Sequence, residues 1–195
     1  DEAGVAEDTI VVFTSDNGGL SAHARGAAPD GQKQHAHNAP LRSGKGSAYE
    51  GGIRVPFVAA GPGIATRSEP IATPVVGTDL YPTMLALAGA SLPAGRTTDG
   101  VDLLPLLRGS GAIAARAMLF HQPHKWGPTG PGIEPFSAIR VEDWKLIWFH
   151  RPAEDGSPRI ELYDVAHDPS ESRDRAADQS EKCAELITAL RDSLA

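Results

Sequence analysis

Two neighbouring polar residues early in the chain have the chemistry of a cation site. Asp16 and Asn17 follow the apolar run of residues 9–15 and are themselves followed by Gly18 and Gly19. A carboxylate and an amide oxygen are ligands that Ca²⁺ and Mg²⁺ prefer, and glycines let a bound group approach the backbone closely. The same four residues are also typical of an ordinary Asp-Asn-Gly turn. The pattern by itself leaves both interpretations open.

A lysine between two glycines is the second group that could do chemistry. Lys45 lies in a glycine turn shortly before the apolar run of residues 53–60. A single ammonium on a tight turn can contact an oxyanion of sulfate or phosphate, and the turn also offers backbone N–H groups. The alternative is a solvated loop lysine. Glu50 and Arg54 follow the turn, and we predict that they form a buried ion pair with a structural role.

Two apolar runs should position these groups. Residues 9–15 and 53–60 carry apolar side chains at both alternating positions, which predicts buried strands of a parallel sheet. Ligands of α/β sheets bind at the carboxyl ends of strands, so Asp16 and Asn17 are expected at such an end. A helix is predicted over residues 78–88, with Thr78 as its cap.

The second part of the chain predicts a different architecture. Short strands are expected at residues 117–121, 137–140, 144–149 and 160–165, followed by an amphipathic helix over residues 179–194. The predicted fold class is therefore α/β up to about residue 110. A small antiparallel sheet with one C-terminal helix follows in residues 111–195.

Composition excludes several classes of function. The 195 residues carry a formal net charge of −7, which argues against nucleic-acid binding. No apolar run approaches the ~20 residues of a membrane span, and no signal-peptide leader is visible. The single cysteine, Cys183, excludes a disulfide framework and is expected to be a core thiol. His35 and His37 could bind a metal in an extended loop, although loop histidines are usually solvated.

Three ordered segments resemble a known family. They are TIVVFTSDNGG, PLRSGKGSAYEGGIRVPFVAAGPG and VGTDLYPTMLALAG, and the later segments AIRVEDWKLI and ELYDVAHDPSESRDRA agree with them. Together they resemble the C-terminal half of type I sulfatases, which belong to the alkaline-phosphatase-like superfamily. The resemblance covers nearly the whole chain. It implies that residues 1–110 are the C-terminal part of the sandwich-like α/β core and residues 111–195 a small α+β subdomain.

The resemblance also implies an activity and its residues. Sulfatases are sulfuric ester hydrolases that cleave sulfate monoesters with a formylglycine nucleophile and Ca²⁺. The resemblance assigns Asp16 and Asn17 as two metal ligands. It assigns Lys45 as a catalytic residue that contacts the sulfate and neutralises charge on the leaving oxygen. It further implies that His121 and His124 contact the substrate near the mouth of the active site.

One part of the family pattern is absent from this chain. The nucleophile motif Cys/Ser-x-Pro/Ala-x-Arg does not occur, and neither do the N-terminal aspartates that complete the Ca²⁺ site. We therefore expect a sulfatase fragment whose missing half precedes Asp1, and we predict that the isolated chain is inactive.

The expected partners of the chain are then a sulfate ester, aryl or carbohydrate, and the missing N-terminal half. The alternatives are a phosphate or phosphonate ester hydrolase of the same superfamily and a non-catalytic sulfate- or glycan-binding relic. Family habit implies a periplasmic or secreted location.

Overall fold

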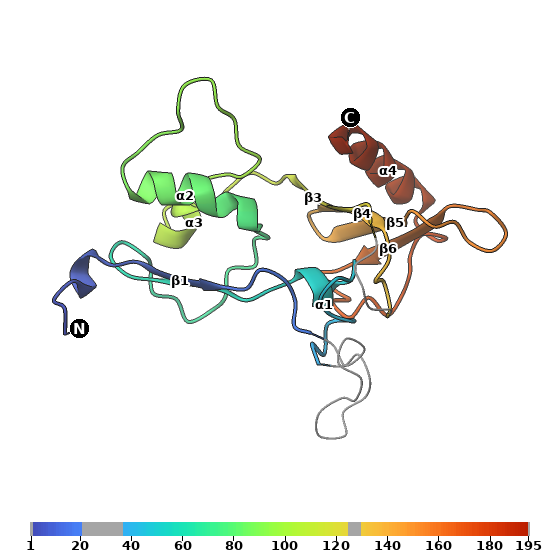
Figure 1. Cartoon of the computed structure of the whole chain (residues 1–195), viewed down its shortest axis with the longest axis horizontal. Coiled ribbons are helices and arrows are strands. Elements are labelled where there is room, and N and C mark those ends of the chain that lie inside the picture. Colours follow the sequence, from blue (N-terminus) through green and yellow to red (C-terminus); the bar gives the residue numbers. More distant parts are fainter. Residues whose placement is uncertain (1, 21–36, 125–129, 195) are drawn as a thin grey trace. The chain divides into compact units, whose positions relative to one another are not determined.

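The computed structural model describes residues 2–20, 37–124 and 130–194. The chain divides into two compact units, of which the first comprises residues 1–16 and 56–115 and the second residues 17–55 and 116–195 (Figure 1). The second unit therefore combines the segment that carries Lys45 with the C-terminal sheet. The two units are defined by contacts within this chain alone and do not test how the chain divides into domains. The domain boundary expected near residue 110 therefore stays a prediction.

The first unit contains a two-stranded ribbon after a short 3-10 turn, η1 (Ala6–Asp8). Strand β1 (Val11–Thr14) pairs antiparallel with β2 (Phe57–Ala60). Apolar side chains of both strands are exposed, Phe13 by 62% and Val58 by 57%. The prediction of two buried strands in a parallel sheet is wrong for this chain. Among the described residues the two strands pair only with each other, and Phe57 and Ala59 of β2 are partly buried against the cluster of Leu103, Leu106 and Leu107.

Two short helices complete the first unit. Helix α2 (Leu80–Leu87) and helix α3 (Leu104–Arg108) contact each other. The core of the unit consists of α3 and the residue before it, packed against partly buried side chains of β2 and the loops. Its buried members are Leu103, Leu106 and Leu107.

The start of α2 depends on a buried carboxylate. Asp79 ends the 3-10 turn η4 (Gly77–Asp79) and is fully buried. Its carboxylate accepts hydrogen bonds from the backbone N–H groups of Val76 and Val101, both at 2.9 Å. The helix predicted over residues 78–88 is present, but Thr78 does not cap it. Asp79 takes this place instead: one carboxylate oxygen accepts the N–H of Val76 just before η4, and the other accepts the N–H of Val101 from a later loop.

The second unit is built on a four-stranded antiparallel sheet in the order β3-β4-β5-β6. The strands are β3 (Ala117–Gln122), β4 (Phe136–Val141), β5 (Trp144–Phe149) and β6 (Arg159–Asp164). Strand pairing confirms the small antiparallel sheet that the sequence predicts.

Helix α4 (Ser180–Leu194) covers one face of this sheet. Its buried residues Leu186 and Leu190 pack against Ile139, Leu146 and Leu162. Partly buried Cys183 joins this cluster, as expected for a core thiol, and burial raises the pKa of its thiol.

The opposite face of the sheet receives a segment from much earlier in the chain. Ala48 and Tyr49 pack among the buried residues Phe136, Ala138, Ile147, Phe149, Tyr163 and Val165. This segment continues into α1 (Glu50–Ile53). The strand predicted over residues 53–60 therefore begins only at Phe57, because the residues before it form a helical turn packed on the sheet.

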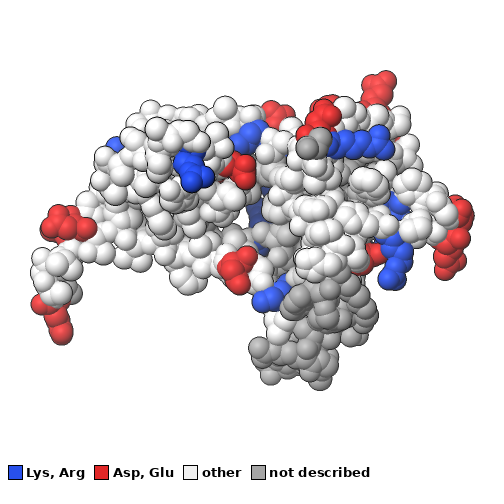
Figure 2. Space-filling model, turned by 45° about the horizontal axis from the view of Figure 1, so that its top comes forward, with Lys and Arg blue, Asp and Glu red and all other residues white. Residues whose placement is uncertain are grey.

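Charge is spread thinly over the surface that Figure 2 shows. Acidic and basic side chains appear there as separate small groups between uncharged residues. Within the described ranges, no helix is both long and apolar enough to cross a membrane.

Candidate functional site

The glycines that follow the predicted cation ligands are packed against α1. Asp16 is exposed and Asn17 is partly buried, and they lie directly after β1. The N–H of Gly18 donates to the carbonyl of Gly52 at 2.9 Å. A Cβ at Gly18 would lie 1.7 Å from the carbonyl oxygen of Gly51. Only glycine therefore allows the segment after Asn17 to approach α1 this closely.

The turn that carries Lys45 is bonded to this same segment. The backbone N–H of Lys45 donates to the carbonyl of Gly19 at 3.1 Å. The side-chain amide of Asn38 donates to the carbonyls of Gly19 and Ser43, both at 2.9 Å. The structure therefore brings the segment that begins at Asn17 against the turn of Lys45, although the two are far apart in the sequence.

A single carbonyl joins the two ends of the Lys45 turn. The buried hydroxyls of Ser43 and Ser47 both donate to the carbonyl of Pro131, at 2.8 and 2.9 Å. Ser43 has a φ of 62° and Gly46 a φ of 84°, so the chain takes left-handed conformations on both sides of Lys45. The position next to Pro131 also requires glycine, because a Cβ at Gly132 would lie 2.6 Å from Oγ of Ser47.

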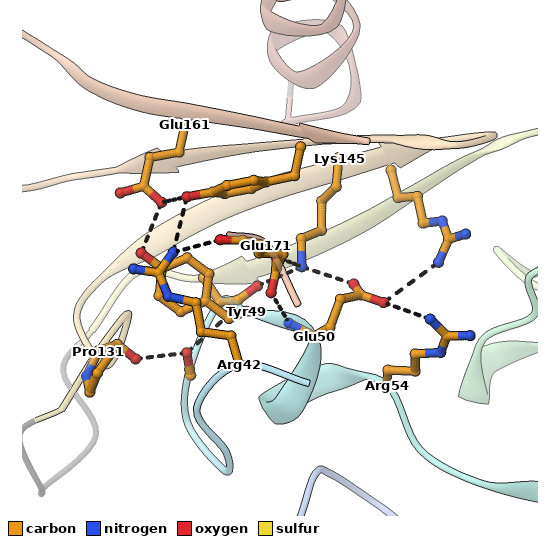
Figure 3. A network of polar contacts seen from close by, with 12 residues as sticks. Arg42, Tyr49, Glu50, Arg54, Pro131, Lys145, Glu161 and Glu171 are labelled. Atoms are coloured by element: carbon orange, nitrogen blue, oxygen red, sulfur yellow. Dashed lines mark hydrogen bonds and ion pairs between the residues drawn. The ribbon is translucent and has the colours of Figure 1, made fainter. Parts of the chain in front are cut away.

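A buried ion cluster holds the segment after the turn (Figure 3). Nζ of Lys145, which is fully buried, lies 2.9 Å from Oε1 of Glu50 and 2.5 Å from Oε1 of Glu171. It also donates to the carbonyl of Ala48 at 3.1 Å. The backbone N–H of Glu50 donates to Oε2 of Glu171 at 2.6 Å. Two buried carboxylates thus share one buried ammonium, which offsets much of the cost of removing each charge from water.

The predicted pair of Glu50 and Arg54 is present but is a minor part of this cluster. Oε2 of Glu50 lies 3.7 Å from Arg54, which is half exposed, and 3.8 Å from Arg140. Lys145 is closer and fully buried. Sequence reasoning missed Lys145 because it lies in an apolar strand, where a lysine ordinarily indicates a solvent-facing position.

Glu171 has an unusual environment for a glutamate near a turn. Burial raises the pKa of Glu171 to about 7, while Lys145 opposes this shift. The sequence places Glu171 in a turn with Asp168, and such turns ordinarily have no chemical role. Asp168 has a local role in this turn, where it accepts hydrogen bonds from Ser170 and Arg173. The side chain of Glu171 is instead buried against Lys145.

An arginine and two tyrosines hold the segment before the turn (Figure 3). Nη1 of Arg42 donates to the hydroxyl of Tyr163 at 3.1 Å and to the carbonyl of Glu171 at 3.2 Å. Its guanidinium lies 3.7 Å from the ring centroid of Tyr49. The hydroxyls of Tyr49 and Tyr163 both donate to Glu161 at 2.8 Å. Burial and this carboxylate raise the pKa of both tyrosines, so both remain neutral donors.

The histidines assigned to the substrate have different surroundings. His124 is exposed. Nδ1 of His121 lies 2.8 Å from Oγ of Ser137, and the same oxygen lies 2.8 Å from Nε2 of His150. Burial and the neighbouring His121 lower the pKa of His150. Sequence reasoning missed His150. His150 directly follows β5, the strand that pairs with the strand of Ser137. That position is the one signal by which the two residues could have been expected to lie close together.

The described residues offer few groups that could hold a metal ion. Within the ranges that the structure describes, no group of three or more His, Cys, Asp or Glu side chains could hold a metal ion. His37 belongs to those ranges, whereas His35 lies outside the described residues. The side chains of Asp16 and Asn17 could offer two hard oxygen ligands, and a Ca²⁺ ion takes ~6–8. The donor set therefore fits part of a Ca²⁺ site.

Comparison with known proteins identifies the family of this chain. Residues 44–195 match the family model described as N-sulphoglucosamine sulphohydrolase, C-terminal. The chain is 42% identical over 148 residues to a steryl-sulfatase of Mus musculus, covering 76% of this chain and 22% of that relative. It is 32% identical over 209 residues to arylsulfatase A of Homo sapiens, covering 97% of this chain and 38% of the relative.

A solved structure shows the same arrangement of the chain. The crystal structure of Ps i-CgsB in complex with k-i-k-neocarrahexaose matches with a TM-score of 0.72 and 27% identity. The match covers 98% of this chain and 37% of that one. The chain thus spans well under half the length of the proteins that it matches.

Proposed function

Because this chain belongs to the sulfatase family, we propose that it is the C-terminal part of a sulfuric ester hydrolase in which Lys45 contacts the sulfate ester. The main support is the main-chain hydrogen bond between Lys45 and Gly19. This bond joins the turn of the lysine to the segment that follows Asp16 and Asn17. A cation and two hard oxygen ligands are then carried by adjoining backbone segments.

The role of Lys45 follows from the charge that develops during hydrolysis. As the S–O bond breaks, negative charge grows on the bridging oxygen of the leaving group. An ammonium held at that oxygen stabilises the transition state more than the ground state. The hydrogen bonds of Ser43 and Ser47 to Pro131 fix the conformation of the turn before the substrate binds. The turn therefore needs little reorganisation during the reaction.

Asp16 and Asn17 are proposed as two ligands of a Ca²⁺ ion. When bound, Ca²⁺ neutralises and positions the sulfate group. Two ligands are too few for tight binding, so the remaining ligands and the formylglycine are proposed to come from residues outside this chain. Cys183 is an unsuitable nucleophile, because it lies on the side of α4 that packs against the sheet, and burial raises the pKa of its thiol.

The proposed substrate is an aryl or carbohydrate sulfate ester. The similar proteins carry the names steryl-sulfatase and arylsulfatase A, and the structure of Ps i-CgsB contains a neocarrahexaose. His121 and His124 are proposed to contact the substrate near the mouth of the active site. The hydrogen bond of His121 to Ser137 would hold its ring in one orientation.

The role of Lys45 is tested by Lys45→Met in the complete gene product. We expect kcat for para-nitrophenyl sulfate to fall by about 10²–10³-fold, as when one preorganised group of this kind is removed. The loss should be larger for phenyl sulfate, because its leaving oxygen is more basic and depends more on the ammonium. Lys182→Met is the matched control, since Lys182 is a surface lysine of α4 paired with Glu185.

Two outcomes would contradict the proposal. Unchanged kcat in Lys45→Met would remove the lysine from the reaction. Faster hydrolysis of para-nitrophenyl phosphate than of the sulfate by the wild-type enzyme would favour a phosphate ester hydrolase of the same superfamily.

A further inference from the structure

We propose that Glu171 is a positioning residue for Lys45, because its carboxylate and its main-chain carbonyl bond to opposite flanks of the Lys45 turn. Glu50 follows the turn and Arg42 precedes it, and both bond to Glu171. This inference rests on the proposed function of Lys45. It adds a residue from a distant part of the chain that touches neither substrate nor metal.

The carboxylate of Glu171 holds the flank after the turn. Its Oε2 accepts the backbone N–H of Glu50 at 2.6 Å. Its Oε1 pairs with Lys145, which donates in turn to the carbonyl of Ala48. Glu171 therefore acts directly on one main-chain group of this flank and, through Lys145, on a second. All three charged side chains are buried, where hydrogen bonds of this kind are electrostatically stronger than in water.

The carbonyl of Glu171 holds the flank before the turn. It accepts a hydrogen bond from Nη1 of Arg42 at 3.2 Å. The carbonyl of Arg42 accepts the N–H of Gly51 at 2.9 Å, so the two flanks are also joined to each other. Glu171 itself has a φ of 51°, a conformation that a non-glycine residue keeps only where its surroundings determine it. Such outliers cluster at positions that serve a site.

Misplacement of this turn has a defined chemical consequence. Lys45 is proposed to act at the leaving oxygen, so a shift of its backbone weakens the stabilisation of charge in the transition state. A displacement of about 1 Å can cost ~10²-fold in rate. The effect should depend on the leaving group, because an oxygen that is a poorer leaving group carries more charge to neutralise. A general loss of folded protein lowers the rates of all substrates equally.

Glu171→Gln separates these effects in the complete gene product. Glutamine keeps the shape and an acceptor for the N–H of Glu50, but removes the charge beside Lys145. We expect kcat for phenyl sulfate to fall by about tenfold, within the ~10²-fold range for a small displacement, and kcat for para-nitrophenyl sulfate to fall less. The ratio of the two rates should move in the same direction as in Lys45→Met. Glu171→Asp, which keeps the charge, provides the same comparison if the glutamine variant does not fold.

Asp79→Asn is the matched control. Asp79 is also a fully buried carboxylate that accepts two backbone N–H groups, but it belongs to the first unit. We expect a lower Tm in this variant with an unchanged ratio of the two rates. A lower Tm with an unchanged ratio in Glu171→Gln as well would overturn the inference and leave the role of Lys45 intact. An unchanged ratio in Lys45→Met would instead reject the proposed function itself.

Discussion

At the scale of single residues, Glu171 is a carboxylate whose ionisation depends on the fold. Burial raises its pKa from the ordinary 4.5 to about 7, against the opposing effect of Lys145. The folded chain therefore binds this proton more tightly than the unfolded chain does. A positive cluster of Lys145, Arg140 and Arg54 lies around Glu50 and Glu171, and protonation of Glu171 changes the charge of this cluster by one unit.

This difference predicts a pH dependence of stability. The contribution of Glu171 is fully present below its unfolded pKa of 4.5 and is lost as the pH rises to about 7. The free energy of unfolding of the wild type, minus that of Glu171→Gln, should fall across this window by at most ~1.4 kcal/mol per pH unit. Urea unfolding of both proteins at several pH values measures it. A difference that stays constant with pH would show that the pKa of Glu171 is ordinary.

A second prediction at this scale concerns the histidines proposed to contact the substrate. His121→Ala and His124→Ala should each raise KM by about 2–10-fold with little change in kcat, because one hydrogen bond contributes ~0.5–1.5 kcal/mol to ground state and transition state alike. Steady-state kinetics with an aryl sulfate measures both constants. His167→Ala is the control, since His167 is an exposed histidine paired only locally with Asp164. Unchanged constants in both variants would remove these histidines from the substrate site.

At the scale of elements, helix α1 depends on packing for its existence. It has four residues, two of them glycine, and no side chain caps its start. Glycine is a poor helix former, so the local sequence favours this turn only weakly. Close contacts of Gly18, Gly51 and Gly52 with neighbouring carbonyls leave no room for a side chain at any of them. The backbone approaches that bring the segment after Asn17 against α1 therefore require these glycines.

Gly18→Ala tests this dependence. The added Cβ would lie 1.7 Å from the carbonyl oxygen of Gly51, so the segment after Asn17 must move away from α1. We expect a loss of about 3 kcal/mol or more, at the upper end for overpacking, together with a loss of activity. Gly77→Ala is the control, because a Cβ at Gly77 meets no atom within 4 Å. Thermal unfolding compares the two, and equal Tm values would contradict the proposed close approach.

At the scale of the whole molecule, the chain exposes an apolar ribbon and carries two residues that we propose as metal ligands. Val11 and Phe13 on β1 and Val58 on β2 are each more than half exposed. Exposed apolar side chains that cluster in this way usually mark a contact surface. The similar proteins are far longer than this chain. These observations support the proposal that further residues complete both the ribbon and the active site.

The isolated chain is accordingly predicted to have no sulfatase activity. It carries Lys45 and the two proposed oxygen ligands, Asp16 and Asn17, but the nucleophile motif does not occur in its sequence. Incubation of the purified chain with para-nitrophenyl sulfate and Ca²⁺ should release no nitrophenol above the rate without protein. Release that disappears in Lys45→Met would show that these 195 residues carry their own nucleophile.

The sequence by itself determined the elements whose signals are local. Short apolar and aromatic runs predicted the four strands, and the apolar stripe predicted α4, because side-chain pattern and backbone conformation are linked within a few residues. The strands expected at residues 137–140 and 144–149 pair as β4 and β5, and Glu142 in the turn between them takes a φ of 52°. The glycine turn of Lys45 was visible in the same way, and its motif indicated the family.

Only the tertiary structure decided which distant groups meet. The antiparallel pairing of β1 and β2, the helix α1 and the link of His121 to His150 all depend on contacts between separate segments. The ion cluster is the clearest case. Lys145 and Glu171 resemble surface residues in the sequence, because charged side chains are ordinarily exposed. Their burial is possible only because the fold brings Glu50, Glu171 and Lys145 to the same face of the sheet, where each charge has a partner.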